Sequence, residues 1–194
     1  MRCLVGGSGG FISGHLIKRL LDEGHSVIAV DIKPQSKWYQ LHPYAENSGR
    51  IDLGDFNQCL SYTRDIDRVY NLAADMGGMG YIAAHRVDTM NSVLSTTNLI
   101  RAARLNGVEE YLFASSACVY NDSLQQTEEV SLVESDAWPA DPEPAYGLEK
   151  LFGEELCKFY LEEYGMQTFS PRFHNIMGPY GTYTGGREKA PAAI

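Results

Sequence analysis

A glycine-rich turn between a short apolar run and an amphipathic segment constrains the fold of this chain more than any other feature. Residues 2–5 are predicted to form a buried strand, residues 6–13 (Gly-Gly-Ser-Gly-Gly-Phe-Ile-Ser) follow at once, and apolar side chains then recur at helical spacing up to Gly24. Glycines at such a turn let the backbone bend sharply and let a pyrophosphate approach the positive end of the helix. Many glycine runs are only tight turns, but a strand before and a helix after provide the context that dinucleotide binding requires.

Segments with strand-like and helix-like patterns alternate along the rest of the chain. This alternation predicts an α/β fold: a doubly wound parallel sheet of the Rossmann type, with six or seven strands and helices on both faces. The length of 194 residues fits one domain with a sizeable core. The predicted strands cover residues 2–5, 26–31, 50–53, 68–73, 110–116 and 167–172. The predicted helices cover residues 12–24, 56–63, 81–106 and 146–164, with loops at 34–49 (a variable surface loop) and 125–144.

Polar and small residues gather where the predicted strands end, which is the edge at which such folds bind ligands. Asp31 ends the second strand about twenty residues after the glycines, where an acid binds the adenosine ribose hydroxyls and disfavours the 2′-phosphate of NADP. The alternative is a carboxylate that simply caps a strand end. The same edge is predicted to carry residues 7–13, Asp52, 71–80, 116–120 and 172–178.

Tyr146 and Lys150 are four residues apart at the start of the last predicted helix, so they share one face of it. A lysine ammonium beside a phenol favours the phenolate, and we therefore expect the pKa of Tyr146 to lie below its ordinary value of about 10. Such a pair suits proton transfer. Most tyrosines and lysines at this spacing lie on the ordinary surface of an amphipathic helix. The functional interpretation of the pair is therefore supported only by the strand-end residues elsewhere in the chain.

The composition argues against several other classes of protein. A formal net charge of -9 is unlike a nucleic-acid binder, which usually presents a basic face. Cys3, Cys59, Cys118 and Cys157 lack the spacing of a zinc site or a disulfide framework, so we expect no metal and a reducing compartment. No apolar run is long enough to span a membrane and no signal-peptide pattern is present, which favours a soluble, cytoplasmic protein.

The glycine turn, Asp31, Ser116 and the Tyr146–Lys150 pair together resemble the extended short-chain dehydrogenase/reductase superfamily, and the resemblance covers essentially all 194 residues. Further motifs narrow it to a nucleotide-sugar branch of the NAD-dependent epimerase/dehydratase family. These motifs are residues 73–80 (AADMGGMG), 115–120 (SSACVY), 134–140 (ESDAWPA), 172–175 (RFHN) and 185–191 (GGREKAP). Two departures from the family are Gly6, where threonine is usual, and Ser13 at the third glycine position. Both residues are small, so NAD binding is expected to survive.

The resemblance implies a role for each matching residue. It makes Tyr146 the redox acid/base, Lys150 its partner on the nicotinamide ribose, and Ser116 a hydroxyl donor to the sugar. Cys118 and Lys189 match the positions of the epimerisation acid/base pair, although taken alone they would be interpreted as a buried structural cysteine and a surface lysine. The positions implied to hold NAD are Gly7, Gly10, Phe11, Ile12, Asp31, Asp52, Tyr146 and Lys150. The positions implied to contact substrate are Gly77, Ser116, Cys118, Asn175, Glu188, Lys189 and Ala190.

The implied reaction is epimerisation of GDP-mannose, or a related nucleotide-sugar, at carbons 3 and 5 to GDP-L-galactose, on the route to ascorbate. Transient oxidation of carbon 4 by bound NAD acidifies both neighbouring carbons, and a thiol and an amine can have pKa values near neutrality. Two alternatives remain open: another nucleotide-sugar 4-epimerase or 4,6-dehydratase, and a truncated NAD-binding module without turnover. The dehydratases carry an Asp-Glu pair where this chain has Ala117-Cys118, and a 4-epimerase leaves Lys189 unexplained.

The resemblance also implies how the domains and subunits are organised. Residues 1–194 are expected to be the NAD-binding domain, with the start of the substrate-binding region from about residue 173 and the rest of the C-terminal substrate domain absent. The predicted helices 81–106 and 146–164 match those that pair in superfamily dimers, so we expect a homodimer. Neither nucleic acid nor a membrane is expected as a partner.

Overall fold

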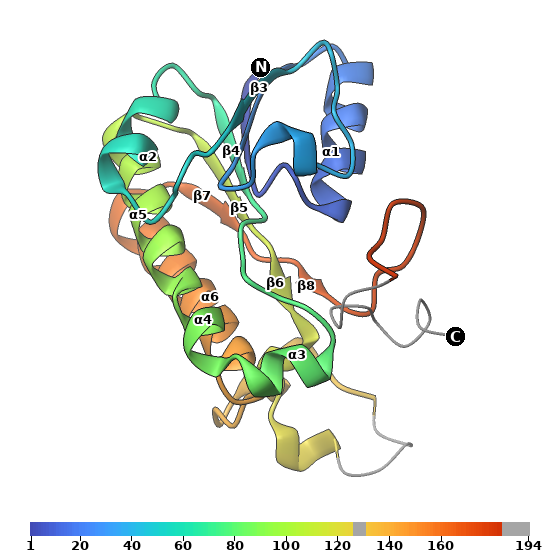
Figure 1. Ribbon diagram of the computed structural model, residues 1–194. Helices are drawn as coiled ribbons and strands as arrows, with labels where there is room; N and C mark the ends of the chain where they lie inside the picture. The colour runs from blue at the N-terminus through green and yellow to red at the C-terminus, as the bar shows by residue number, and fades with distance from the viewer. Residues whose placement is uncertain (126–130, 184–194) are drawn as a thin grey trace.

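A parallel β-sheet forms the centre of the protein, of which the computed structural model describes residues 1–125 and 131–183. The six strands lie in the order β3-β2-β1-β4-β5-β7, and the chain crosses over after β3, so the predicted doubly wound fold is confirmed (Figure 1). A second, two-stranded parallel sheet continues beyond the carboxyl end of β5 and pairs β6 (Ser115–Ser116) with β8 (Arg172–Phe173). The strands of the main sheet are β1 (Arg2–Gly6), β2 (Ser26–Asp31), β3 (Glu46–Gly49), β4 (Arg68–Asn71), β5 (Glu110–Phe113) and β7 (Gln167–Phe169).

Helices pack on both faces of the sheet, because alternate residues of the inner strands point to opposite sides. In β1, Leu4 faces a core shared with α2 (Phe56–Tyr62), α5 (Ser92–Leu105) and α6 (Tyr146–Tyr164). Its neighbours Cys3 and Val5 face α1 (Phe11–Asp22) on the other side. Figure 1 shows these two layers separated by the sheet.

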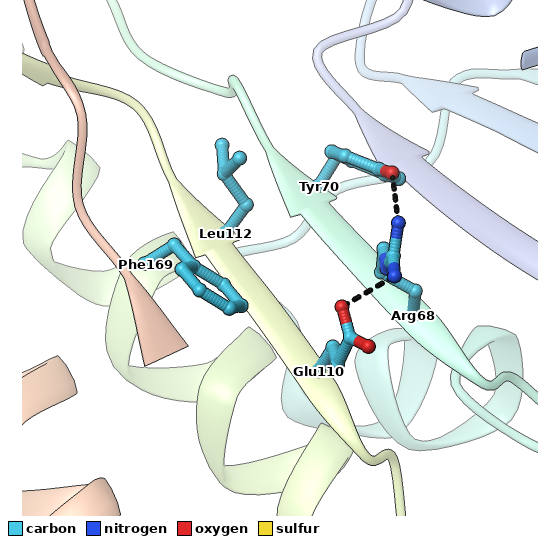
Figure 2. A pocket seen from close by; sticks show the side chains of 5 residues that line it. All are labelled: Arg68, Tyr70, Glu110, Leu112 and Phe169. Carbon is cyan, nitrogen blue, oxygen red and sulfur yellow. Dashed lines mark hydrogen bonds and ion pairs between the residues drawn. The ribbon is translucent and has the colours of Figure 1, made fainter. Parts of the chain in front are cut away.

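The face of the sheet beneath α1 is only partly covered. Helix α1 packs on β1 and β2, and no described helix covers the same face over β5 and β7. An open hollow of about 300 Å³ lies there (Figure 2), in which Arg68 pairs with Glu110 at 2.5 Å and donates to the Tyr70 hydroxyl at 3.0 Å. The hollow is lined by Arg68, Tyr70, Glu110, Leu112 and Phe169.

The predicted helix 81–106 is wrong as one continuous element. The chain forms α3 (Met79–Ala84), α4 (Arg86–Met90) and α5 in succession. The first break falls at His85, whose backbone (φ -125°, ψ 45°) is not helical and whose ring stacks on Tyr81 with centroids 4.2 Å apart.

The predictions for the third strand and for the surface loop before it are also wrong. Strand β3 lies at residues 46–49, and the chain leaves it at Arg50, which has a φ of +65° that no strand residue adopts. Residues 50–52 are therefore irregular rather than a strand, and they lead into a turn at residues 53–54. The preceding segment is not simply surface either, since Trp38 and Ala45 belong to the core beneath α1.

The predicted strands 110–116 and 167–172 each split in two. The first is interrupted at Ala114, between β5 and β6, and the second between β7 and β8. In each case the chain leaves the main sheet and enters the second one. Helices α1, α2 and α6 match their predictions, with Asp55 capping α2 and Gly165 (φ +68°) ending α6.

Candidate active site

The glycine turn joins the carboxyl end of β1 to α1 and packs against the end of β4. Gly7 has a φ of +76°, and a Cβ there would lie 2.7 Å from the Leu72 carbonyl oxygen, so only glycine fits. The Ser13 hydroxyl donates to the Gly7 carbonyl at 2.6 Å, which shows how serine replaces a third glycine. Gly10 precedes α1, and no side chain caps the helix there, so the amide N–H groups of the first turn can donate hydrogen bonds to an anion.

Asp31 ends β2 directly beside this turn. Its two carboxylate oxygens accept the Gly9 and Lys33 amide hydrogens, both at 2.8 Å. The Trp38 side chain closes over the turn: a Cβ on Gly9 would lie 2.7 Å from its ring, and its indole N–H donates to the Lys33 carbonyl at 3.0 Å. Sequence reasoning missed Trp38. The residue type was the available signal, because a tryptophan in a predicted surface loop can bury a large apolar surface.

The other positions implied to hold a cofactor are more exposed. Asp52 lies in the turn after β3, where its carboxylate accepts the Gly54 amide hydrogen at 2.8 Å. Phe11 and Ile12 open α1, and the Phe11 ring lies 3.5 Å from the Cβ position of Gly178. The segment after β8 therefore returns to the glycine turn, so the structure brings the proposed cofactor and substrate regions together.

Tyr146 and Lys150 lie in the first turns of α6 and are buried, with 7% and 2% of their surfaces exposed. The Lys150 ammonium lies 5.5 Å from the centroid of the Tyr146 ring and 4.7 Å from that of Phe113. The expected low pKa of Tyr146 is wrong: its pKa is raised above the ordinary value. Burial is the largest cause, because it penalises the phenolate, and the Glu149 carboxylate is the next. Lys150 does not reverse the shift, since its ammonium pairs with Glu149 at 3.5 Å.

Ser116 and Cys118 come from the end of β6 and the turn that follows it. The Ser116 hydroxyl oxygen accepts the Cys118 amide hydrogen at 3.2 Å, and its hydrogen bond to Tyr146 lowers the pKa of that phenol. The Cys118 carbonyl accepts the Glu143 amide hydrogen at 3.0 Å and lies only 2.2 Å from the Cβ position of Gly147. The structure thus brings Ser116, Cys118 and Tyr146 together, with the start of α6 pressed against the Cys118 turn.

An ion-pair network anchors the small sheet to α6. Arg172 donates to both carboxylate oxygens of Glu154 at 2.9 and 2.8 Å, and the Ser115 hydroxyl donates to the same carboxylate at 2.5 Å. The Arg172 guanidinium also lies 4.8 Å from the centroid of the Tyr120 ring. Because Ser115 precedes Ser116, this network fixes the candidate serine relative to the helix. Sequence reasoning missed Glu154, since an acid on a helix gives no sign of a partner 18 residues away.

The positions implied to contact substrate are described only in part. Gly77 precedes α3 and packs against Tyr81, whose Cβ lies 2.9 Å from the Cβ position of that glycine. Asn175 follows β8 and is exposed. Glu188, Lys189 and Ala190 lie outside the described residues, so the pairing of Cys118 with Lys189 stays a prediction.

Residues 1–125 and 131–183 contain neither a metal-binding cluster nor a membrane-spanning helix. No group of three or more His, Cys, Asp or Glu side chains in these ranges is arranged to hold a metal ion. Among the helices described there, none is long and apolar enough to span a bilayer.

The chain is similar to known proteins in both sequence and fold. The family model "Epimerase: NAD dependent epimerase/dehydratase family" matches residues 3–194. GDP-mannose 3,5-epimerase of Arabidopsis thaliana is 49% identical over 196 residues, which is 100% of this chain and 52% of that protein. GDP-mannose 3,5-epimerase 1 of Oryza sativa subsp. indica is 48% identical over 195 residues, 100% of this chain and 51% of that protein. The chain therefore spans about half the length of the curated relatives it matches.

The fold also matches solved structures. The crystal structure of UDP-glucose 4-epimerase from Thermus thermophilus in complex with NAD superimposes with a TM-score of 0.83 at 28% identity, over 95% of this chain and 58% of that one. The UDP-N-acetylglucosamine 4-epimerase from Methanobrevibacter ruminantium gives a TM-score of 0.83 at 24% identity, over 98% and 60% of the two chains, and shows the fold alone.

Proposed function

The chain belongs to the NAD-dependent epimerase/dehydratase family, and from that premise we propose that it is part of an enzyme that epimerises GDP-mannose at carbons 3 and 5. The product is GDP-L-galactose, formed through transient oxidation at carbon 4. The observation that carries the proposal is the meeting of Ser116, Cys118 and Tyr146 at one strand end. A phenol suits the proton transfer that accompanies oxidation at carbon 4, and a separate thiol suits proton transfer at a neighbouring carbon. Similarity over the whole chain to two plant enzymes supports this substrate.

NAD is the proposed cofactor, and the glycine turn supports it. The close backbone approach at Gly7 and the uncapped start of α1 fit a pyrophosphate, and Asp31 stands beside the turn, where it suits ribose hydroxyls and disfavours a 2′-phosphate. Bound NAD would supply the reversible hydride acceptor for the oxidation at carbon 4 of the sugar. The residues proposed to hold it are Gly7, Gly10, Phe11, Ile12, Asp31, Asp52, Tyr146 and Lys150.

The side chains then carry the proton transfers. Tyr146 is proposed to take the proton of the carbon 4 hydroxyl, while the Ser116 hydroxyl holds the same oxygen in place. The resulting ketone acidifies the hydrogens on carbons 3 and 5, which are otherwise too weakly acidic for a side chain to remove. Cys118, which is half-buried, and Lys189 are proposed to remove and return those protons on the two faces of the ring. The remaining residues proposed to contact substrate are Gly77, Asn175, Glu188 and Ala190.

We further propose that residues 1–194 are the NAD-binding domain of a longer enzyme, with the substrate-binding region beginning near residue 173. The uncovered face over β5 and β7 supports this proposal, because Leu112 and the half-exposed Phe169 offer apolar surface for a further segment to bury (Figure 2). A cytoplasmic location and a place in ascorbate synthesis belong to the same proposal, by likeness to the plant enzymes.

A homodimer through α5 and α6 completes the proposal. The apolar residues Leu148, Phe152 and Phe159 are exposed and fall on one stripe of α6, and Leu94 is exposed on α5. Light scattering at micromolar concentration should give the mass of two chains, and Phe152→Glu should give a single chain with unchanged NAD affinity. A wild-type monomer would contradict this assembly.

Deuterium exchange tests the reaction. The NAD-loaded protein, alone and joined to the C-terminal half of the Arabidopsis relative, is incubated with GDP-mannose in heavy water. Deuterium at carbons 3 and 5 of the sugar is the expected result. Absence of label from the longer, NAD-loaded form would refute the proposal.

The same experiment separates the two alternatives. A 4-epimerase inverts carbon 4 without label at carbons 3 and 5, and a module without turnover binds NAD but leaves the sugar unchanged. The half-buried thiol of Cys118 beside Tyr146 favours the 3,5-epimerase, because a 4-epimerase has no use for a second acid/base.

A further inference from the structure

Glu149 lies between the two residues of the redox pair in the sequence, is buried, and has no part in the proposed reaction. Only 1% of its surface is exposed. Adjacent residues of a helix point about 100° apart and do not normally face each other. The Glu149 carboxylate nevertheless lies 3.5 Å from the Lys150 ammonium, because both side chains are enclosed on the buried side of α6.

The Glu149 carboxylate is poorly compensated for a buried charge. Neither of its oxygens accepts a hydrogen bond from the described residues, and its contact with Lys150 is longer than a charge-assisted hydrogen bond of about 2.8 Å. Burial raises the pKa of Glu149, and Lys150, the charged group of the described chain that acts on it, lowers that pKa only in part. An amide or apolar side chain would suit a purely structural position better, because an incompletely paired buried charge costs stability.

The same carboxylate acts on Tyr146. After burial it is the largest cause of the raised pKa of Tyr146, and smaller effects of the same sign come from Cys118 on the turn after β6 and from Glu143 on the loop before α6. The Lys150 ammonium lies 5.5 Å from the centroid of the Tyr146 ring, and in general a cation near a phenol favours the phenolate. The Glu149 carboxylate and a Tyr146 phenolate therefore depend on the same Lys150 ammonium for stabilisation.

We propose that Glu149 is a positioning residue for the redox pair: it holds the Lys150 ammonium over the rings of Tyr146 and Phe113 and sets how readily Tyr146 releases its proton. The proposal rests on the proposed function for the role of Tyr146 as the redox base. The ion pair itself does not depend on any substrate.

Replacing Glu149 with glutamine removes the charge and keeps the shape. The loss of a negative charge near Tyr146 lowers the pKa of the phenol. Because the phenolate is the form that accepts the hydroxyl proton, the rate rises with pH through that pKa. The acid side of the pH–rate profile should therefore move to lower pH, and the rate at a pH on that limb should exceed the wild-type rate.

The assay is single-turnover reduction of bound NAD by GDP-mannose, followed by the absorbance of the reduced nicotinamide across the pH range. It uses the form of the protein, alone or joined to the C-terminal half of the relative, that exchanges deuterium. Glu155→Gln is the matched control, because it removes the same charge from the same helix at a partly exposed position paired with Lys158. Its profile should coincide with that of the wild type. A Glu149→Gln rate lowered equally at every pH, or an unmoved profile, indicates a merely structural role and overturns the proposal.

Infrared spectroscopy tests the pairing without any turnover. In Lys150→Met the buried Glu149 carboxylate loses the partner that lowers its pKa, so it should take up a proton more readily than in the wild type. The carbonyl stretch of a protonated carboxyl should then appear in Lys150→Met and be missing from the double variant Glu149→Gln/Lys150→Met. Equal spectra for the two variants overturn the proposal. If the wild type reduces no NAD in the first assay, the proposed function fails, and this measurement alone decides whether Glu149 holds Lys150.

Discussion

Replacing Gly147 with alanine tests whether the contact between α6 and the Cys118 turn positions the proton-transfer groups. A Cβ at residue 147 would lie 2.2 Å from the Cys118 carbonyl oxygen and 3.0 Å from the carbonyl carbon. Ordinary van der Waals contact begins at 3.4 Å, so the helix start or the turn must move by about 1 Å. Tyr146 is the adjacent residue, so the displacement changes the separation of the phenol from Ser116 and Cys118. A misplacement of about 1 Å can lower a rate about 100-fold.

The rate of deuterium incorporation into GDP-mannose measures this effect. We expect a loss of about 100-fold and destabilisation of about 1–3 kcal/mol from overpacking, with NAD still bound, because the glycine turn and Asp31 are untouched. Gly80→Ala is the matched control: a Cβ there meets nothing within 4 Å, so its rate should stay near that of the wild type. If Gly147→Ala folds and exchanges deuterium at the wild-type rate, the close contact does not position the site.

Three further predictions concern Cys118, Asp31 and Glu149. Cys118→Ala should abolish exchange while leaving NAD bound; exchange at the wild-type rate would exclude the thiol from the reaction. Asp31→Ala should weaken NAD binding more than NADP binding in a fluorescence titration, because the carboxylate repels a 2′-phosphate, and equal losses would mean that it does not contact the ribose. Glu149 has a pKa raised by burial in the folded state, so its contribution to stability is present at acid pH and is lost as the pH rises through the raised pKa. The free energy of unfolding of the wild type should therefore fall relative to that of Glu149→Gln by up to about 1.4 kcal/mol per pH unit in that window, in urea titrations, and a constant difference would contradict the pKa shift.

Sequence reasoning succeeded where a local pattern determines local structure. The glycines after β1 and the apolar period of the next helix define the turn that contains Gly7, and the run of β2 ends at Asp31 in both sequence and structure. Tyr146 and Lys150 lie on α6 as their spacing predicted. Each of these features depends on residues that lie close to one another in the sequence.

The features that sequence reasoning missed depend on long-range packing. Strand β3 is a polar edge strand, Glu-Asn-Ser-Gly, which is specified by its pairing with β2 rather than by an apolar pattern. The break at His85 is a local exception, because neither a glycine nor a proline marks it although the backbone there is not helical. The sign of the Tyr146 pKa shift could not be derived from a four-residue spacing, because burial is its largest cause and the Glu149 carboxylate the next.

On the proposed function, the charges around Tyr146 also impose an order on the proton transfers. Negative charge on Cys118 raises the pKa of Tyr146, so the phenol releases its proton more readily while Cys118 is a neutral thiol. Tyr146 needs to be the phenolate only until it has taken the hydroxyl proton from carbon 4, and Cys118 needs to be the thiolate only after the ketone exists. Oxidation at carbon 4 is therefore favoured before Cys118 carries a charge. The charge that raises the pKa of Tyr146 thus orders oxidation ahead of epimerisation.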